Sequence, residues 1–487
     1  MSDKKKILFW PDVYKEQGHW LPTLAWADYL KEWHDINYMG IADCQEIVTK
    51  YNLKNGTNFG YETIFSCQEK SVDYSIYPYG YTNEVVTTPG TRWKTDHIWT
   101  LVAAGFDSEK SLNKVGFPSD TKIYKCAQEF RKIWKRINPD LLISGYFTAL
   151  ELLIIYYHHH VKTKVFTNEK IQFAFSTTYL RHPEEDPAAH ALQNLQAFSV
   201  AEQNKIINMV KNDSDDVDTI YDDPGISLEE FVSPLSTFHE FIPCIKSFDY
   251  SQYEHGSKVH YVEPCMTKEL EPDNNEYSDE YWHDFLNAHK KIVFVTAGSQ
   301  ILDYKEKALI LFQSIIDAMQ ASDMSGYQLV LCAGATLVQE LKSDYENVSI
   351  FGWVPQRKIL ESLADTEHTG SCAIIHGGLA TIKECVYCNV PFLVLPLGKD
   401  QMDNALRLED YGINNYFYIE FIKPKCLLYF INQILQDYVS LANLAALSKE
   451  FHIAENSHVG AKYIKELVET GRIEEFDGPA VEESDSD

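Results

Sequence analysis

The chain has few basic residues for its length, and this deficit excludes one class of partner. Its 487 residues include 43 Lys and Arg against 71 Asp and Glu, which gives a formal net charge of -28. A surface with such an excess of negative charge repels nucleic acid and anionic membranes. We therefore expect no nucleic-acid partner, and local geometry must hold any anionic ligand.

Long apolar runs and a leader-like start are also missing. No stretch of the sequence approaches the roughly 20 apolar residues of a membrane-spanning helix. The charged start, Met1 to Lys6, leads straight into the strand-like Ile7 to Trp10, without the apolar core or cleavage site of a signal peptide. These features predict a protein without a transmembrane segment, located in the cytoplasm.

The ten cysteines are scattered and form neither a disulfide framework nor paired sets of metal ligands. Cys385 and Cys388 have CxxC spacing, but no second pair accompanies them, so we interpret them as packing residues. Scattered cysteines are typical of reduced thiols in a cytosolic protein. The cysteine pattern therefore predicts no metal site.

Length and the pattern of elements predict two domains. The chain exceeds the size at which one hydrophobic core stops growing. Short β-rich runs alternate with helical patterns in both halves, as is typical of parallel strands joined by crossover helices. The predicted strands are 7–10, 36–41, 141–144, 172–176, 292–296, 328–332, 348–351, 372–375 and 392–395. The predicted helices include 22–33, 121–137, 303–320, 357–364, 380–388, 402–410, 427–449 and 457–471.

Shifts in composition indicate the boundaries between these units. Polar residues with Pro, Asp and Asn mark a linker, and the acidic end of the chain is typical of disorder. The predicted units are a first domain 1–263 with a helical insertion at about 183–230, a linker 264–285, a second domain 286–456, a further helix 457–473 and a disordered tail 474–487.

One strand–turn–helix segment in the second domain carries the strongest chemical signal. The strand 372–375 ends at His376, two glycines follow, and the next helix begins near Leu379. Glycines let a ligand approach the backbone, and the free N–H groups of a helix start attract an anion. Thr381 adds a hydroxyl, and the Glu384 carboxylate one turn later can accept the hydroxyls of a ribose. This geometry predicts a nucleoside diphosphate site, whereas the glycines alone would fit any phosphate loop.

The residues around this turn resemble the donor signature of the family 1 UDP-dependent glycosyltransferases. That pattern has Trp-x-Pro-Gln, then His-x-Gly, Ser or Thr, Glu and Val-Pro, and finally Asp or Glu before Gln, with a later Asn. The spacing from His376 to Gln401 matches the family without a gap. The matching residues are Trp353, Pro355, Gln356, His376, Gly378, Thr381, Glu384, Val390, Pro391, Asp400, Gln401 and Asn404.

For the nucleoside and the sugar, the resemblance implies five contacts. Trp353 would stack on the uracil, although a thymine would stack there too. Gln356 would contact the nucleoside, and Glu384 would bind the ribose. Asp400 and Gln401 would bind hydroxyls of the transferred sugar, and a Gln at this position is usual for glucose donors.

For the diphosphate, the resemblance implies binding by His376, Gly378 and the helix start with Thr381. Ser299, in a Gly-Ser turn after an earlier strand, would also contact the diphosphate. No cofactor and no divalent metal is implied, because the helix dipole takes the place of the metal. Ala380 departs from the family pattern, because an Asn often stands there and Ala cannot supply its amide.

A second matching segment lies in the first domain, where Gly18-His19 is followed by Pro22. Pro22 fits near the first turn of the predicted helix 22–33. The segment resembles the one whose histidine deprotonates the acceptor hydroxyl in the same family. Taken alone, His19 would be a helix-start residue with a local hydrogen bond. Beside the donor motif we interpret it as the catalytic base, since the pKa of histidine lies near neutrality.

The carboxylate that usually holds this histidine is missing from its expected place. The segment that begins at Pro139 follows the family pattern until Gly145, where an aspartate is usual. An orienting carboxylate can matter greatly in such a pair. Asp12, Asp96 and Glu151 are the candidates to replace it; otherwise the histidine acts alone.

Together these features predict an α/β protein of the GT-B fold, with two Rossmann-like domains facing across a cleft and the last helix crossing back to the first domain. The predicted function is inverting transfer of a sugar, with glucose implied, from a UDP-sugar to a hydroxyl of a small, largely apolar acceptor, with His19 as the base. One alternative is a catalytically weak UDP-sugar-binding partner of another enzyme, motivated by Gly145 and Ala380. The other alternative is a sugar-nucleotide epimerase.

Overall fold

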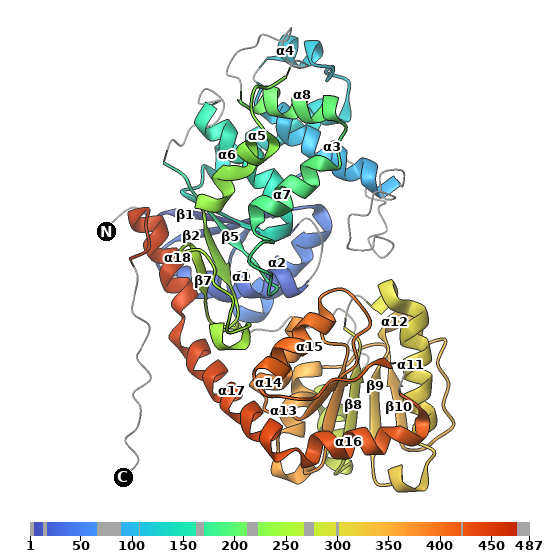
Figure 1. Cartoon of the computed structure of the whole chain (residues 1–487). Coiled ribbons are helices and arrows are strands. Elements are labelled where there is room, and N and C mark those ends of the chain that lie inside the picture. Colours follow the sequence, from blue (N-terminus) through green and yellow to red (C-terminus); the bar gives the residue numbers. More distant parts are fainter. Residues whose placement is uncertain are drawn as a thin grey trace, which may run out of the picture.

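Two parallel sheets organise the chain, one in each half of the sequence (Figure 1). The first sheet has the order β3-β2-β1-β4-β5-β6-β7 and the second the order β10-β9-β8-β11-β12. The computed structural model describes residues 4–12, 17–65, 89–106, 108–161, 170–211, 223–266, 277–298, 301–419 and 422–474. The strands of the first sheet are β1 (Lys6–Trp10), β2 (Asp35–Gly40), β3 (Gly60–Thr63), β4 (Leu141–Gly145), β5 (Gln172–Ser176), β6 (His239–Ile242) and β7 (Val259–Tyr261). Those of the second are β8 (Ile292–Thr296), β9 (Gln328–Cys332), β10 (Val348–Phe351), β11 (Cys372–Ile375) and β12 (Phe392–Val394).

The strands that the sequence predicted are those with continuous apolar runs. Helices cover both faces of a parallel sheet, so its central strands are buried on both sides. In β8 no residue is more than 4% exposed. By contrast β3, β6 and β7 were not predicted, because they are short and carry polar residues such as His239 and Glu240. Two of them, β3 and β7, form the edges of the first sheet.

Helices connect the strands, and α5, α11, α13, α14, α15 and α18 have bounds close to those predicted. Those of the first domain are α1 (Gln17–Leu30), α2 (Gln45–Asn55), α3 (Pro89–Ala104), α4 (Glu109–Lys114), α5 (Lys122–Ile137), α6 (Ala149–Val161), α7 (Pro187–Gln196), α8 (Val200–Lys211) and α9 (Leu228–Val232). Those that follow are α10 (Asp279–Ala288), α11 (Lys305–Ala318), α12 (Gly334–Leu337), α13 (Gln356–Leu363), α14 (Leu379–Tyr387), α15 (Gln401–Asp410), α16 (Leu427–Gln436), α17 (Tyr438–Ser457) and α18 (Val459–Thr470).

Three predictions about helices were wrong. The first helix begins at Gln17, so Pro22 lies inside it and removes one internal hydrogen bond. Helix α10 occupies part of the predicted linker, because the Ser278 side chain caps its start at 3.1 Å from the N–H of Tyr281. The helix predicted at 427–449 is two helices, since Asp437 ends the first and caps the second.

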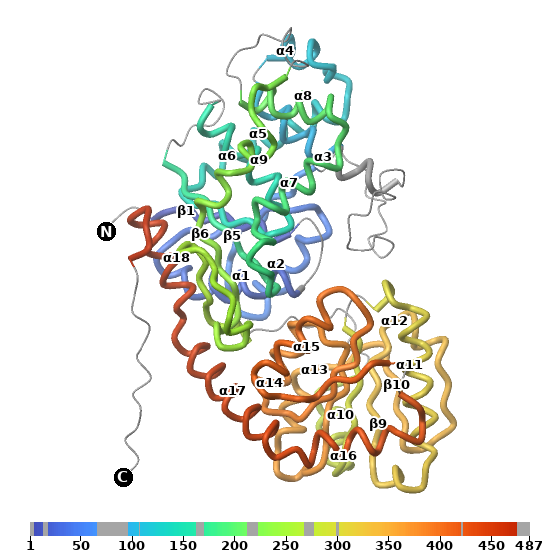
Figure 2. The backbone as a smooth tube through the Cα atoms, viewed as in Figure 1, coloured from blue at the N-terminus to red at the C-terminus, as the bar shows by residue number. Residues whose placement is uncertain are grey.

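The C-terminal helices join the two domains. Helix α17 packs against α14 of the second domain, and α18 packs against α1 of the first. Figures 1 and 2 show this pair (red) running from one domain to the other. His458, in the left-handed backbone region at φ 49°, separates the two helices. The predicted tail and residues 267–276 of the predicted linker lie outside the described residues.

Buried polar contacts also connect the domains. Lys383 of α14 donates from Nζ to the carbonyl oxygens of Pro243 at 2.7 Å and Pro264 at 2.8 Å. Arg407 of α15 pairs with Asp249 of the first domain, with 2.7 Å between Nε and Oδ1. Both helices therefore lie at the surface of the second domain that meets the first.

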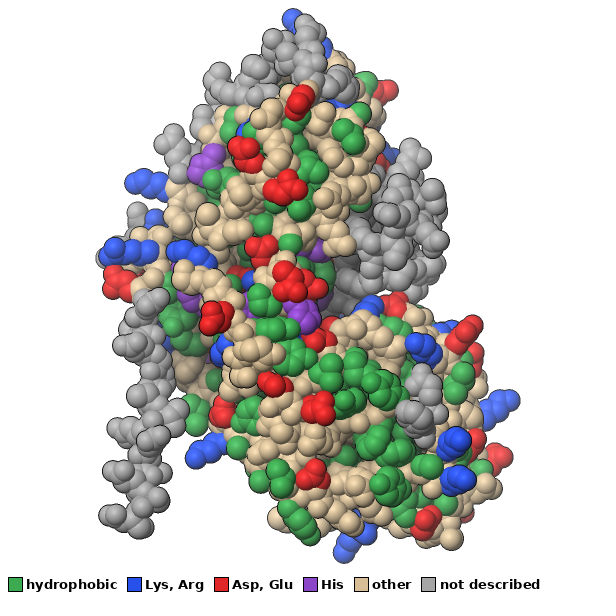
Figure 3. Space-filling model, in the orientation of Figure 1, with side chains coloured by type: hydrophobic (Ala, Val, Ile, Leu, Met, Phe, Trp, Pro, Cys, Tyr) green, Lys and Arg blue, Asp and Glu red, His purple; other side chains and the backbone are tan. Residues whose placement is uncertain are grey.

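Acidic side chains are scattered over both domains on the face drawn in Figure 3, as the net charge of -28 leads one to expect. Within the described residues, every helix is too short or too polar to serve as a membrane span. Among the described residues, eight cysteines have free thiols, whereas Cys126 in α5 is disulfide-bonded. The expectation of reduced thiols therefore fails at Cys126, because spacing along a chain does not show which sulfurs approach each other.

Candidate functional site

In each sheet, one predicted site histidine lies beyond a strand at which the winding direction reverses. This reversal falls between β1 and β4 in the first sheet and between β8 and β11 in the second. Ligands of open α/β sheets bind beyond the carboxyl ends of such strands. His19 follows β1 and Gly145 ends β4, while Gly298 follows β8 and His376 follows β11.

The glycine turn after β11 brings backbone N–H groups to the surface of the site. Gly377 has φ 94°, and a Cβ atom there would lie 2.9 Å from the carbonyl oxygen of Gln401. A residue with a side chain would be both strained and crowded at this position. Gly378 then forms the N-cap of α14, so the first N–H groups of that helix are available to an anion.

The imidazole of His376 lies against both Gly298 and Gly378. A Cβ atom at Gly298 would lie 2.6 Å from the ring atom Cε1, and one at Gly378 would lie 2.5 Å from Nε2. Burial, with a smaller contribution from the Lys399 ammonium, lowers the pKa of His376 to about 4. The ring is therefore neutral near pH 7 and can donate an N–H to a phosphate oxygen.

Three predicted donor residues come together at the starts of α13 and α14. Gln356 donates from Nε2 to the Glu384 carboxylate, and the same nitrogen lies 3.5 Å from Oγ1 of Thr381. Trp353 is half-buried and lies in the loop just before α13. The carboxylate of Glu384 is thus fixed by an amide beside the anion site.

The Asp400-Gln401 pair is fixed by Asn404. The Asn404 amide is fully buried and donates to the carbonyl oxygen of Gly377 at 3.1 Å and to Oδ2 of Asp400 at 2.9 Å. Oε1 of Gln401 accepts from two backbone N–H groups of the preceding loop, at 2.7 and 3.0 Å. These bonds tie the start of α15 to the glycine turn. Ser299, the remaining predicted donor residue, lies outside the described residues.

Lys399 belongs to this group, although the sequence motif did not include it. Its Nζ lies 2.5 Å from Oδ2 of Asp303 and 5.8 Å from the ring centroid of Tyr304. Its positive charge contributes, after burial, to the lowered pKa of His376. Its position directly before Asp400 was the signal that could have revealed it.

The predicted base has a carboxylate partner. Nδ1 of His19 lies 2.5 Å from Oδ2 of Asp12, and the Asp12 side chain is completely buried. Of the three candidates for this role, Glu151 instead lies 3.1 Å from Nε2 of His97. Asp12 therefore supplies a buried carboxylate beside His19.

Two aromatic rings of the first domain stack in a row beside His19. Its ring stacks on Phe147 with 5.3 Å between centroids, and Phe147 stacks on Tyr179 at 5.7 Å. Both aromatic residues are half-buried. They form an apolar wall beside the histidine. The tyrosine-rich segment near residues 74–81, which the sequence also offered for this purpose, lies outside the described residues.

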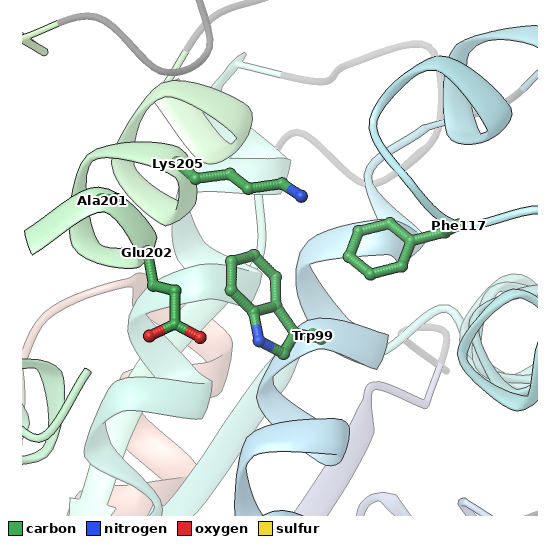
Figure 4. A pocket seen from close by; sticks show the side chains of 5 residues that line it. All are labelled: Trp99, Phe117, Ala201, Glu202 and Lys205. Carbon is green, nitrogen blue, oxygen red and sulfur yellow. The ribbon is translucent and has the colours of Figure 1, made fainter. Parts of the chain in front are cut away.

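A cavity of about 290 Å³ lies away from these residues, among α3, α8 and the loop at Phe117 (Figure 4). The ammonium of Lys205 sits between the rings of Trp99 and Phe117, 5.3 and 5.0 Å from their centroids. It also donates to the carbonyl oxygen of Val115 at 2.8 Å. The Lys205 ammonium thus occupies the space between the two aromatic rings that line this cavity.

Comparison with known proteins identifies the second domain. Residues 269–454 match the family model described as UDP-glucoronosyl and UDP-glucosyl transferase. Over this stretch the chain is similar to the family 1 UDP-dependent glycosyltransferases. The matched stretch contains all the donor residues that the sequence predicted, from Ser299 to Gln401.

Relatives with UDP-glycosyltransferase names align with part of the chain. A UDP-glycosyltransferase of Talaromyces amestolkiae is 28% identical over 27% of either chain. The UDP-glycosyltransferase stmC of Aspergillus ustus is 26% identical over 40% of either chain. The chain therefore matches less than half the length of these relatives, and what the whole protein does is a matter for proposal.

Solved structures extend the likeness to nearly the whole chain. The glycosyltransferase of kitacinnamycin has a TM-score of 0.58 at 16% identity and covers 96% of this chain and 99% of its own. The calicheamicin glycosyltransferase has a TM-score of 0.59 at 12% identity, with the same coverage. At such identities the likeness concerns the fold alone, and it confirms the predicted GT-B fold of two Rossmann-like domains.

Proposed function

We propose that this protein transfers a sugar from a UDP-sugar to a hydroxyl of a small, largely apolar acceptor, with inversion at the anomeric carbon. The observation that carries the proposal is the His19–Asp12 pair at the reversal point of the first sheet, in a chain whose second sheet has the donor motif at its own reversal point. A base and a donor site at these two places are what a two-substrate transfer needs.

The donor side supports a nucleoside diphosphate. The glycine turn and the start of α14 offer N–H groups to the diphosphate, while Glu384 offers a carboxylate to the ribose. Gln401, with its Oε1 held by the backbone, directs its amide to a sugar hydroxyl, and glucose is the donor sugar we propose. A spinosyn rhamnosyltransferase of similar fold is known in complex with thymidine diphosphate, so thymidine donors belong in any screen.

The reaction follows from these placements. Nε2 of His19 takes the proton of the acceptor hydroxyl, since Nδ1 is occupied by Asp12. The acceptor oxygen then attacks the anomeric carbon, the bond from that carbon to the diphosphate breaks, and UDP leaves. The start of α14 stabilises the charge that develops on the leaving diphosphate, so we infer a reaction independent of divalent metal. The stacked Phe147 and Tyr179 support an apolar acceptor. The cytoplasmic location stays a prediction from the sequence.

A His19→Ala variant tests the proposal. Transfer should fall by on the order of 100-fold or more, because the acceptor hydroxyl loses its base. Binding of UDP, measured by calorimetry, should be unchanged. The control is His283→Ala, an exposed histidine of α10 whose side chain is 71% exposed. Mass spectrometry of the products from a panel of donors and acceptors measures both variants. Full turnover by His19→Ala would show that the base is another group.

The competing proposal of a catalytically weak sugar-nucleotide binder rested on Gly145 and Ala380. Asp12 weakens the first ground, because a carboxylate is present beside His19. The comparisons favour neither this proposal nor an epimerase. Binding of UDP-sugar without transfer to any acceptor would favour the weak binder. A changed sugar nucleotide without acceptor would reveal an epimerase.

A further inference from the structure

The end of β4 is closed to any side chain. A Cβ atom built at Gly145 would lie 1.8 Å from the carbonyl oxygen of Pro11 and 2.7 Å from its carbonyl carbon. Both contacts are with backbone, which cannot swing away as the end of a side chain can. The aspartate usual at this position in the family therefore has no room here.

The strand register explains why these two backbones meet. Strands β1 and β4 are parallel neighbours, with Trp10 opposite Ser144. The next residues, Pro11 and Gly145, lie side by side as the chain leaves each strand. Pro11 is followed at once by Asp12, whose buried carboxylate bonds His19. The loop that excludes a side chain from β4 is thus the loop that supplies the carboxylate.

We propose that Asp12 is the positioning residue for His19, and that Gly145 is required because it leaves space for the loop that holds Asp12. The kinetic part of this proposal rests on the proposed function, whereas the structural part does not. The carboxylate beside His19 comes from the loop after β1, whereas the family pattern has it at the end of β4. Gly145 and Asp12 are then a linked pair.

The geometry around the imidazole defines what this pair does. The Asp12 carboxylate accepts the Nδ1–H of His19, which leaves the lone pair on Nε2. Phe147 of the η4 turn (Tyr146–Thr148) stacks on the ring and fixes its plane. His190 of α7 lies behind Phe147, at 5.5 Å between centroids. Without the carboxylate, the proton of the neutral ring would no longer be held on Nδ1, and the ring would be less basic.

The first test measures the basicity of His19 without any sugar transfer. Diethyl pyrocarbonate modifies neutral imidazole, and peptide mass spectrometry reports the rate at His19 as a function of pH. In Asp12→Asn the midpoint should move to lower pH, because a neighbouring carboxylate favours the charged ring. Gly145→Ala should move it in the same direction, since its methyl group displaces Pro11 and Asp12.

The matched control is Gly256→Ala, a glycine of the same domain at which a Cβ atom meets nothing within 4 Å. Its midpoint should equal that of the unchanged protein. Circular dichroism establishes that each variant is folded, and Asp12→Asn serves alone if Gly145→Ala does not fold. An unchanged midpoint in Asp12→Asn overturns the role of Asp12. A shift in Asp12→Asn but not in folded Gly145→Ala overturns the role of Gly145.

The second test uses acceptors of different acidity. Asp12→Asn should lose transfer to an aliphatic alcohol by on the order of 100-fold or more, and much less to an acidic phenol that is already ionised. Equal losses on both acceptors would indicate general damage and contradict a positioning role. If the unchanged protein transfers no sugar while the midpoint still shifts, the positioning pair stands and only the proposed function fails.

Discussion

At the scale of the residue, His376 shows how packing sets the charge of a binding group. Two glycines allow the backbone to close around the imidazole, and this burial lowers its pKa to about 4. The imidazole of His376 is therefore uncharged near pH 7 before a donor binds. A bound diphosphate would change this, because an anion at hydrogen-bond distance favours the imidazolium.

Binding of UDP-glucose should therefore take up a proton. The pKa of His376 is depressed in the free protein and is raised by the bound diphosphate, so affinity should increase as the pH falls toward the value in the complex. We expect roughly three- to tenfold tighter binding at about pH 5 than at about pH 8. Calorimetry in buffers of different ionisation enthalpy measures the proton directly. His376→Asn should lose the effect, and His283→Asn should keep it; affinity independent of pH would contradict this role.

At the scale of the element, α18 is held to the first domain by one buried carboxylate. Glu263 follows β7 and accepts from the N–H groups of Gly460 at 2.5 Å and Ala461 at 3.3 Å. Burial raises its pKa to about 7, although these two N–H groups and the helix start act in the opposite direction. The crossing helix thus begins at a group that titrates near neutrality.

Glu263 should make stability depend on pH in a defined direction. Its pKa is raised on folding, so its stabilising contribution is complete below the unfolded value of 4.5 and is lost as the pH rises through about 7. Relative to Glu263→Gln, the free energy of unfolding should fall by on the order of 1–3 kcal/mol between about pH 5 and pH 8. Urea denaturation at several pH values measures this. The exposed Glu474→Gln is the control, and parallel pH profiles of Glu263→Gln and the unchanged protein would refute the assignment.

At the scale of the whole molecule, Arg407 connects α15 of the second domain to the first domain. Its guanidinium pairs with Asp249 and Asp403 and donates to the carbonyl oxygen of Leu180 at 3.3 Å. Burial alone would raise the pKa of Asp249, but hydrogen bonds from His255, Tyr261 and Arg407 hold it well below its usual range. Both members of the Arg407–Asp249 pair are fully buried.

Removal of this cation should destabilise the protein more than removal of any surface charge. Arg407→Met leaves Asp249 buried without its main counter-ion, so the free energy of unfolding should fall by about 3–5 kcal/mol. Arg472→Met, which removes an ion pair whose side chains are 73% and 68% exposed, should change it by less than about 1 kcal/mol. Urea denaturation followed by tryptophan fluorescence compares the two. A double variant Arg407→Met with Asp249→Leu should recover part of the loss, and equal effects of the two single variants would contradict this account.

The sequence by itself predicted the strand, turn and helix around His376. His376, Thr381 and Glu384 lie on one strand, turn and helix, so local geometry fixes their relation and their spacing is informative. The buried strands of the second sheet were predictable for the same reason, since each is a short apolar run with its own turn signals. Short strands such as β3 and β7 were not, because their residues favour a strand only beside a neighbour.

Only the tertiary structure decided which carboxylate lies beside His19. The sequence offered three carboxylates for His19, and no spacing rule distinguishes among residues on separate loops. The pairing of β1 with β4 places Pro11 against Gly145, and this single contact both excludes the usual aspartate and brings Asp12 to the imidazole. A motif within one element can be read along the chain, whereas a partnership between the ends of two strands exists only once the sheet has formed.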